Sequence, residues 1–269
     1  VLCRVRPAKK AGETVAEASG LMSSGMHRAL TMRGVASTGG ARLADGHGGA
    51  ATRTFEFDRV FGETSPTEEV YDELRPLAKA VADGSRATVL AYGQTGSGKT
   101  YTMLGMQRLA VNQLLSSLSA AGSRAGTAPP SLRLAVIEVH NERLLDLLDE
   151  NADKKLDVRM GKDGQPFVDG ASWHAVGSAD DAQGFVDAAA RRRITADNGL
   201  NERSSRSHLA MIYQVVSEAG ASLGQLCMVD LAGSERLSRT EATGALQQET
   251  AAINKSLSAL GDVMTAIAA

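Results

Sequence analysis

The sequence contains few of the residues that hold metals or cross-link a chain. Its 269 residues include two cysteines, Cys3 and Cys227, and five histidines that show no spacing of the kind used by zinc sites. Each cysteine lies inside an apolar run typical of a strand, so we expect both thiols to pack rather than to form a disulfide or a redox site. Trp173 is the single tryptophan, and we expect it to pack as well.

Neither sign of charge predominates, and long apolar runs are missing. The 29 Lys and Arg residues nearly balance the 31 Asp and Glu residues, so the composition indicates no nucleic-acid partner. No run reaches the length of a membrane span, and the N-terminus lacks a signal-peptide pattern, so we expect a soluble, intracellular protein without a membrane partner. A hydrophobic content of 43% allows one sizeable core, and we expect one domain.

A glycine-rich segment directly follows a short apolar run typical of a buried strand. From Gly93 to Thr100 it has the pattern G-x-x-x-x-G-K-T, which predicts a phosphate-binding loop between a strand and a helix. Glycines let the backbone aim successive N–H groups at phosphate oxygens, Lys99 would reach the β- and γ-phosphates, and Thr100 would ligate Mg²⁺. The alternative is a simple glycine-rich turn. The candidate nucleotide-binding residues of this loop are Gly93, Gln94, Thr95, Gly96, Ser97, Gly98, Lys99 and Thr100.

Two further polar segments each lie next to a strand-like run. They are Asn-Glu-Arg-Ser-Ser-Arg-Ser-His over 201–208 and Asp-Leu-Ala-Gly-Ser-Glu over 230–235. With the phosphate loop, and in this order, they resemble the motor domain of the kinesins. Similar family segments are Phe-x-Phe-Asp-x-Val-Phe over 55–61, Asn-Glu followed by Asp-Leu-Leu over 141–148, and Asn-Lys-Ser-Leu-Ser-Ala-Leu-Gly-Asp over 254–262.

The resemblance implies a fold, an activity and a partner. The fold would be α/β, a phosphate-loop NTPase with a central, mostly parallel or mixed sheet and helices on both faces, forming one motor domain over 1–269. The activity would be ATP hydrolysis, with ATP and Mg²⁺, coupled to movement on microtubules (tubulin) in the cytoplasm and its cytoskeleton. A dimer would form through a stalk outside this chain, and the motifs are most similar to the C-terminal-motor class.

The polar segments over 201–208 and 230–235 are called the first and second switch-like segments. The first carries three residues to which the resemblance assigns roles. Ser205 would bind Mg²⁺ or its water, and Ser204 would help to hold the attacking water. Arg206 would pair with Glu235 when the site closes, which would couple the two segments.

The second switch-like segment begins where an apolar strand ends in an acid. Asp230 is placed as the acid that reaches Mg²⁺ through water in phosphate-loop enzymes. Gly233 has no Cβ and can bring its N–H against the γ-phosphate. Glu235 is the best candidate to accept the proton through a water relay. The alternative for this segment is a turn that ends a strand.

The resemblance also assigns contacts to the rest of the nucleotide. Arg4, Arg6 and Pro7 would contact the base and ribose, Tyr101 would stack on the adenine, and Asn198 would contact the phosphates. The alternatives are two solvated arginines at a strand end and a tyrosine packed in the core.

Positive charge for the acidic tubulin surface would come from two places. A hairpin predicted around 161–164 carries Arg159 and Lys162, and the helix predicted over 245–269 and the segment before it carry Lys255, Arg236 and Arg239. Solvated surface charge is the alternative for each. The arginine run over 191–193 lies at the end of a helix predicted to begin near Ser178, where cations are favoured without any nucleic acid.

Three features depart from the resemblance. Residues 8–52 show no sustained period and predict a flexible connection with at most a weak strand. The segment after Met103 lacks the loop and the Gly-Ile-Ile-Pro-Arg-like segment that kinesins usually insert. Both ends look cut, because Val1 begins in mid-strand and Ala269 ends an apolar helix without a cap or stop signal. Kinesin motor domains also continue past the last helix into a further loop, helix, interior strand and closing helix, so we expect a fragment.

Two other classes of function compete with a motor. One is a nucleotide-binding, microtubule-associated module without productive motility. The other is a phosphate-loop enzyme for a small molecule or a GTPase, although the Asn-Lys-x-Asp signature of many GTPases is absent from the sequence.

Overall fold

The computed structural model describes residues 1–7, 17–21, 27–33, 52–151, 154–195, 203–235 and 245–269. These residues form two compact units, Val1–Val70 and Tyr71–Ala269, and each is described by itself. Among the described residues, no helix is both long enough and apolar enough to cross a bilayer.

The first unit is built on a four-stranded sheet with the order β1-β4-β3-β2. Its strands are β1 (Leu2–Arg4), β4 (Thr52–Phe61), β3 (His27–Arg33) and β2 (Glu17–Leu21). β1 runs parallel to β4, and the pairings of β3 with β4 and with β2 are antiparallel. The expectation of at most a weak strand over 8–52 is therefore wrong, because β3 is held by pairing with β4 and β2 by pairing with β3, and not by an alternating pattern of their own.

The second unit contains the main sheet, with the order β10-β6-β11-β12-β5 and with β7 paired to β6. Its strands are β5 (Arg86–Ala91), β6 (Ser131–His140), β7 (Arg143–Asp146), β10 (His174–Val176), β11 (His208–Val216) and β12 (Ser222–Asp230). Of the two arrangements expected, mostly parallel or mixed, the sheet is mixed. Its described pairings are antiparallel except for that of β12 with β5.

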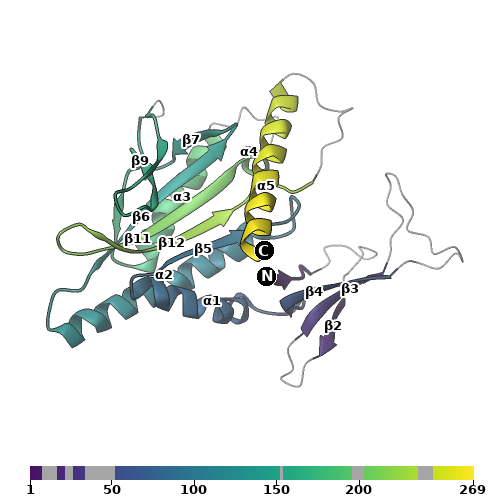
Figure 1. The fold of residues 1–269 in the computed structure, drawn as a ribbon, viewed down its shortest axis with the longest axis horizontal. Helices are drawn as coiled ribbons and strands as arrows, with labels where there is room; N and C mark the ends of the chain where they lie inside the picture. The colour runs from purple at the N-terminus through teal and green to yellow at the C-terminus, as the bar shows by residue number, and fades with distance from the viewer. Residues whose placement is uncertain (8–16, 22–26, 34–51, 152–153, 196–202, 236–244) are drawn as a thin grey trace, which may run out of the picture. The chain divides into compact units, whose positions relative to one another are not determined.

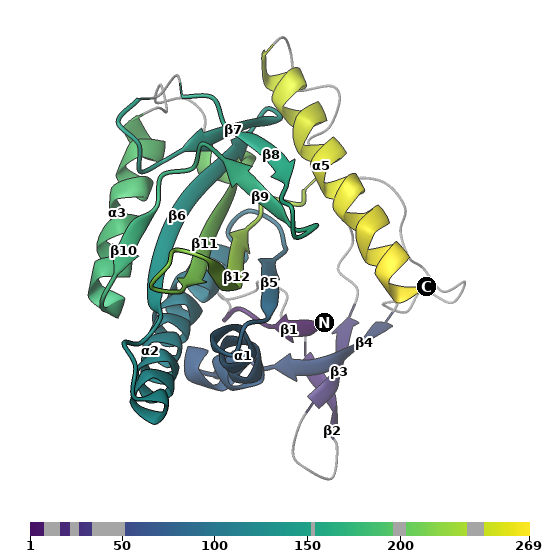
Figure 2. The same cartoon turned by 60° about the vertical axis from the view of Figure 1, so that its left-hand side comes forward.

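Helices lie on both sides of this sheet. They are α1 (Thr67–Ala82), α2 (Lys99–Ala125), α3 (Ala179–Thr195), the short α4 (Arg203–Arg206) and α5 (Ala245–Ala268). Figure 2 shows α2 and α3 on one side of the strands and α5 on the other, as the sequence predicted. α2 is continuous despite the missing insertion after Met103, and α1 continues through Pro76 instead of ending there.

The main core lies between the sheet and α2 and α3. Met211, Tyr213 and Val215 alternate along β11 and are fully buried, which is the period of two that a strand requires. Met103 and Leu114 of α2 are fully buried as well. The β11 residues between Met211 and Val215 are buried as well, so both faces of β11 are covered, and the strand lies inside the sheet between β6 and β12.

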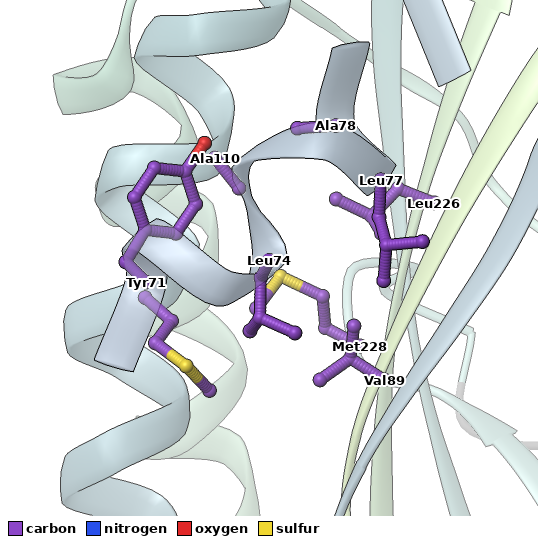
Figure 3. Close-up of a pocket in the computed structure, with 9 residues that line it drawn as sticks. Tyr71, Leu74, Leu77, Ala78, Val89, Ala110, Leu226 and Met228 are labelled. Carbon is purple, nitrogen blue, oxygen red and sulfur yellow. The ribbon is translucent and has the colours of Figure 1, made fainter. Parts of the chain in front are cut away.

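A small apolar pocket lies between α1, α2 and the strands β5 and β12 (Figure 3). Tyr71, Leu74 and Leu77 line it from α1, and Leu226 and Met228 line it from β12. The Tyr71 hydroxyl is buried and has no hydrogen-bond partner among the described residues. Burial also raises the pKa of Tyr71 above its usual value.

The predicted start of α3 near Ser178 is confirmed by its capping contacts. Ser178 Oγ accepts a hydrogen bond from the Asp181 N–H at 3.0 Å, and Asp181 Oδ2 accepts one from the Gly177 N–H at 3.0 Å. At the other end of α3, Arg193 forms a buried ion pair with Glu138 at 3.1 Å. This arginine therefore has a structural role inside the protein.

The smaller hairpin predicted around 161–164 is also confirmed. Its strands β8 (Asp157–Met160) and β9 (Pro166–Asp169) pair antiparallel, and the turn between them places Gly164 at a positive φ of 71°.

Two tyrosines give a matched test of the packing. Tyr71→Phe removes a buried hydroxyl without a partner in the described chain, so we expect the free energy of unfolding to stay the same or to rise by about 1 kcal/mol. Tyr213→Phe removes the acceptor of a 2.7 Å hydrogen bond from Gln107 Nε2, so we expect a loss of about 1–3 kcal/mol. Chemical denaturation of both variants measures the difference, and a Tyr71→Phe variant less stable than Tyr213→Phe would contradict this description.

Candidate nucleotide-binding site

The glycine-rich loop joins β5 to α2, as the sequence predicted. Gly93, Gly96 and Gly98 have φ values of 153°, 78° and 99°, which other residues rarely adopt. A Cβ on Gly93 would lie 2.7 Å from Ser97 Oγ, so the loop also lacks room for a side chain there. Gly98 occupies the N-cap of α2, where no side chain caps the first N–H groups. The loop thus presents backbone donors at the positive end of a long helix, which suits an anion.

Lys99 extends back across this loop. Its ammonium group donates to the carbonyl oxygens of Gly93 at 2.9 Å and Gln94 at 3.1 Å. The Gln94 carbonyl also accepts from the Ser97 N–H at 3.1 Å. These contacts hold a positive charge over the same backbone that would surround a phosphate.

Asp230 reaches the loop because β12 runs parallel to β5. Asp230 pairs with Ala91 in the register of the two strands, so both strands end at the same edge of the sheet. Thr100 Oγ1 donates to Asp230 Oδ2 at 2.5 Å, while Asp230 Oδ1 is buried without a partner among the described residues. Burial raises the pKa of Asp230, and the Thr100 hydroxyl and the Lys99 charge oppose that rise. A buried carboxylate oxygen and a hydroxyl are the hard donors that Mg²⁺ prefers.

The two switch-like segments are joined to each other and to the loop through their backbones. The Gly233 N–H donates to the Ser205 carbonyl at 2.9 Å, and the Ser234 N–H donates to the Gly93 carbonyl at 3.1 Å. A Cβ on Gly233 would lie 2.4 Å from both carboxylate oxygens of Glu235, so a side chain at this position would displace that carboxylate. The structure therefore brings the three motifs together at one edge of the sheet.

Glu235 is bound to the phosphate loop. Its carboxylate accepts from the Thr95 N–H at 2.9 Å and from the Thr95 hydroxyl. Burial alone would raise the pKa of Glu235, but the hydrogen bonds from Thr95 and the charge of Lys99 outweigh it and lower the pKa. Glu235 is therefore ionised at neutral pH.

Arg206 has a partner that the sequence did not predict. Its guanidinium lies 3.1 Å from Glu249 of α5, whereas the sequence predicts a pair with Glu235 when the site closes. His140, at the end of β6, donates to the other oxygen of Glu249 at 2.9 Å. Glu249 belongs to no quoted motif, and His140 is known from the sequence only as the residue before the Asn-Glu segment at 141; neither contact could be predicted, because both join segments far apart in the sequence.

His208 connects the first switch-like segment to α5 as well. Its Nδ1 accepts from the Ala232 N–H at 3.0 Å, so its Nε2 carries the proton and donates to Ser256 Oγ at 2.8 Å. Burial lowers the pKa of His208, and the nearby charge of Arg193 adds to the effect, so the ring is neutral. In the sequence, His208 was noted only as the last residue of the segment over 201–208, without a role of its own.

Several predicted site residues lie elsewhere in the chain. Arg4 belongs to the first unit, where it donates to Thr67 Oγ1 at 3.3 Å and to the Ser65 carbonyl at 3.2 Å. Arg6 is half-buried and Pro7 exposed in the same unit. Tyr101 is 70% exposed, which excludes the alternative of a core tyrosine.

Some predicted positions have no described side chain. Ser204 lies in α4, but its side chain is outside the described part. Asn198, Arg236 and Arg239 lie outside the described residues.

Two of the cations expected to face tubulin have partners within the chain. Arg159 lies 3.1 Å from Asp169 and 3.6 Å from Asp157, and Lys255 lies 2.5 Å from Glu142. These exposed pairs are weak, and they are open to exchange with other carboxylates.

The fold and the site define the class of protein first. A strand, a loop with three positive-φ glycines, a helix that begins with Lys-Thr and an acid at the end of the adjacent parallel strand together form a phosphate-loop NTPase.

The comparison with known families then identifies the chain within that class. The family model described as the kinesin motor domain matches residues 4–269, and the chain belongs to this family. Kinesin-like protein KIN-14E of Oryza sativa subsp. japonica is 37% identical over 276 aligned residues, which cover 100% of this chain and 24% of that protein. This chain therefore spans about a quarter of the length of such curated relatives.

Solved structures agree with this assignment. The C-terminal motor and motor homology domain of Kar3Vik1, fused to a synthetic heterodimeric coiled coil, has a TM-score of 0.80 at 29% identity, covering 97% of this chain and 68% of that one. The motor domain of the Saccharomyces cerevisiae kinesin-related protein Kar3 has a TM-score of 0.76 at 28% identity, covering 97% and 79%.

The buried carboxylate of Asp230 gives a test that needs no ligand. Because its pKa is raised in the folded state, its ionisation costs stability above that pKa, and the cost disappears as the pH falls through it toward about 4, the ordinary value for aspartate. We therefore expect Asp230→Asn to raise the unfolding midpoint at pH 7 and to lose this advantage as the pH approaches 4.

Thermal unfolding across this pH range measures the effect. The exposed Asp83→Asn serves as the control, and we expect it to give no comparable pH-dependent gain. A lower midpoint for Asp230→Asn at pH 7 would mean that the site stabilises the ionised carboxylate.

Proposed function

We propose that this chain is the ATP-hydrolysing, microtubule-binding core of a molecular motor, and that residues 1–269 act as one motor domain. The observation that carries the proposal is the convergence of three segments on one sheet edge. The phosphate loop, the strand-ending Asp230 and Glu235 are joined there by hydrogen bonds. Membership of the kinesin motor domain family supports the choice of ATP and of microtubules over other substrates and partners.

The phosphates of ATP would be held by the loop and by Lys99. The N–H groups from Gly93 to Thr100 would donate to phosphate oxygens, with the Lys99 ammonium moving from the loop carbonyls to the β- and γ-phosphates. Mg²⁺ would be held by Thr100, Ser205 and Asp230, the last through water, and the buried Asp230 Oδ1 without a partner in the described chain supports this assignment. Mg²⁺ held there would neutralise part of the negative charge of the phosphates.

Hydrolysis would use residues of both switch-like segments. Ser204 would help to hold the attacking water, Ser205 would bind Mg²⁺ or its water, and the Gly233 N–H would contact the γ-phosphate. Glu235 would accept the proton through a water relay, which requires an ionised carboxylate, and its lowered pKa supports this role. Arg206 would pair with Glu235 as the site closes.

The base and ribose contacts are assigned by the resemblance to the kinesins. Arg4, Arg6 and Pro7 would contact the base and ribose, and the exposed ring of Tyr101 would stack on the adenine. Asn198 would contact the phosphates.

Microtubules would be the partner, in the cytoplasm and on its cytoskeleton. The hairpin of β8 and β9, with Arg159 and Lys162, and α5, with Lys255 and the preceding Arg236 and Arg239, would face the acidic tubulin surface. The similarity to KIN-14 proteins and to a C-terminal motor supports the C-terminal-motor class. A dimer would form through a stalk beyond this chain, and the heterodimeric coiled coil to which the similar Kar3Vik1 domains are fused supports such an arrangement.

The test is steady-state ATP turnover with and without microtubules. We expect microtubules to stimulate turnover by the parent chain, and Glu235→Ala to lower the stimulated rate by roughly 10²–10³-fold, the range expected for losing a general base, while nucleotide still binds. Glu218→Ala, an exposed carboxylate in the turn between β11 and β12, is the matched control and should keep the parent rate. Nucleotide binding without stimulated turnover by the parent would overturn the proposal.

A further inference from the structure

Glu249 binds two donors that come from separate parts of the chain. One carboxylate oxygen lies 3.1 Å from the Arg206 guanidinium of α4, and the other lies 2.9 Å from His140 Nε2 at the end of β6. The three side chains are 16–21% exposed, so water screens the contacts only in part. Figure 1 shows the N-terminal end of α5 beside α4, where these contacts form.

The same face of α5 makes a second contact with the first switch-like segment. Ser256 lies seven residues, or about two helical turns, after Glu249 and therefore lies on the same face of the helix. Its hydroxyl accepts from His208 Nε2 at 2.8 Å. α5 thus holds both Arg206 and His208, on either side of the buried Ser207.

The backbones near Arg206 and Glu235 lie close together, but the two side chains bind other partners. Ser205, the residue before Arg206, accepts a 2.9 Å hydrogen bond from the N–H of Gly233, which is two residues before Glu235. The two segments are therefore already neighbours. Arg206 nevertheless binds Glu249, and Glu235 binds Thr95.

We propose that Glu249, supported by His140, is a positioning residue that competes with Glu235 for Arg206. While α5 holds the guanidinium, the ion pair between the two switch-like segments does not form; a shift of α5 that withdraws Glu249 releases Arg206 to Glu235. The effect on ATP turnover rests on the proposed function. Through the contact of Glu249 with Arg206, a partner that binds α5 would regulate that turnover.

The two oxygens of Glu249 explain why His140 belongs to this arrangement. A carboxylate with one hydrogen-bonded oxygen can rotate to follow a mobile arginine, whereas a second donor on the other oxygen fixes its plane. His140 therefore orients Glu249 toward Arg206, and its loss weakens the hold on Arg206 without removing the charge of Glu249.

Glu249→Gln tests the competition with little change in shape. Glutamine keeps the acceptor oxygen but not the charge, so it holds Arg206 less tightly and leaves it available to Glu235. We therefore expect turnover without microtubules to rise about fivefold or more, and the ratio of stimulated to unstimulated turnover to fall by a similar factor. His140→Phe should change both in the same direction but less. A purely structural role for Glu249 would leave that ratio unchanged.

Glu142→Gln is the matched control. Glu142 also forms an ion pair with α5, through Lys255, but its side chain is 55% exposed and lies outside the three motifs of the site. We expect its unstimulated turnover to equal that of the parent. An equal rise in Glu142→Gln and Glu249→Gln would mean that general loosening of α5, and not release of Arg206, causes the effect.

A double-mutant cycle of thermal stability tests the competition without nucleotide. Arg206→Ala and Glu235→Ala are combined in the parent and in the Glu249→Gln background. We expect their effects on the unfolding midpoint to be additive in the parent and to show a favourable coupling when Glu249 is neutral. The same coupling in both backgrounds would overturn the inference.

This second measurement separates the inference from the proposed function. A parent chain that hydrolyses no ATP, yet shows the coupling only in the Glu249→Gln background, would disprove the proposed function and support the competition for Arg206. A parent that hydrolyses ATP, yet shows no dependence of the coupling on Glu249, would support the function and disprove the competition.

Discussion

The parallel pairing of β5 with β12 is the constraint on which the site depends. Because both strands run in the same direction and end together, the loop after Ala91 and the carboxylate of Asp230 meet at one edge of the sheet. An antiparallel pairing would place Asp230 at the opposite end of β5. The hydrogen bond from Thr100 to Asp230 and the contacts of Gly233 and Ser234 follow from this single alignment.

Near this edge of the sheet, buried polar contacts hold the first switch-like segment in place. The ion pair of Arg193 with Glu138 also binds Ser207, so the strand that follows the first switch-like segment is anchored to α3. Such a pair contributes little net stability after desolvation, but it fixes the geometry of the groups it joins. Arg206, the residue directly before Ser207, is bound instead to α5. Two adjacent residues of the first switch-like segment therefore contact two different helices, α3 and α5.

The prediction from sequence succeeded where a few adjacent residues determine the outcome and failed where distant segments do. The positive-φ glycines of the phosphate loop, the serine cap of α3 and the β8–β9 hairpin follow from local backbone rules, and each is present. β2 and β3 were missed because neither has an alternating pattern; β3 is a strand through its pairing with β4, and β2 through its pairing with β3. The predominance of antiparallel pairs could not be predicted either, since strand direction depends on the path of the connections.

For the site, the sequence by itself determined the chemistry: a loop that only glycines can form, a lysine and a threonine at the start of a helix, and acids placed after a buried strand. These choices depend on backbone sterics and on the chemistry of each side chain, which act over a few residues. Tertiary structure alone decided which acid binds Arg206. That choice joins β6, α4 and α5, which are 43 to 109 residues apart in the pairs they form, and only packing brings such segments within reach of a hydrogen bond.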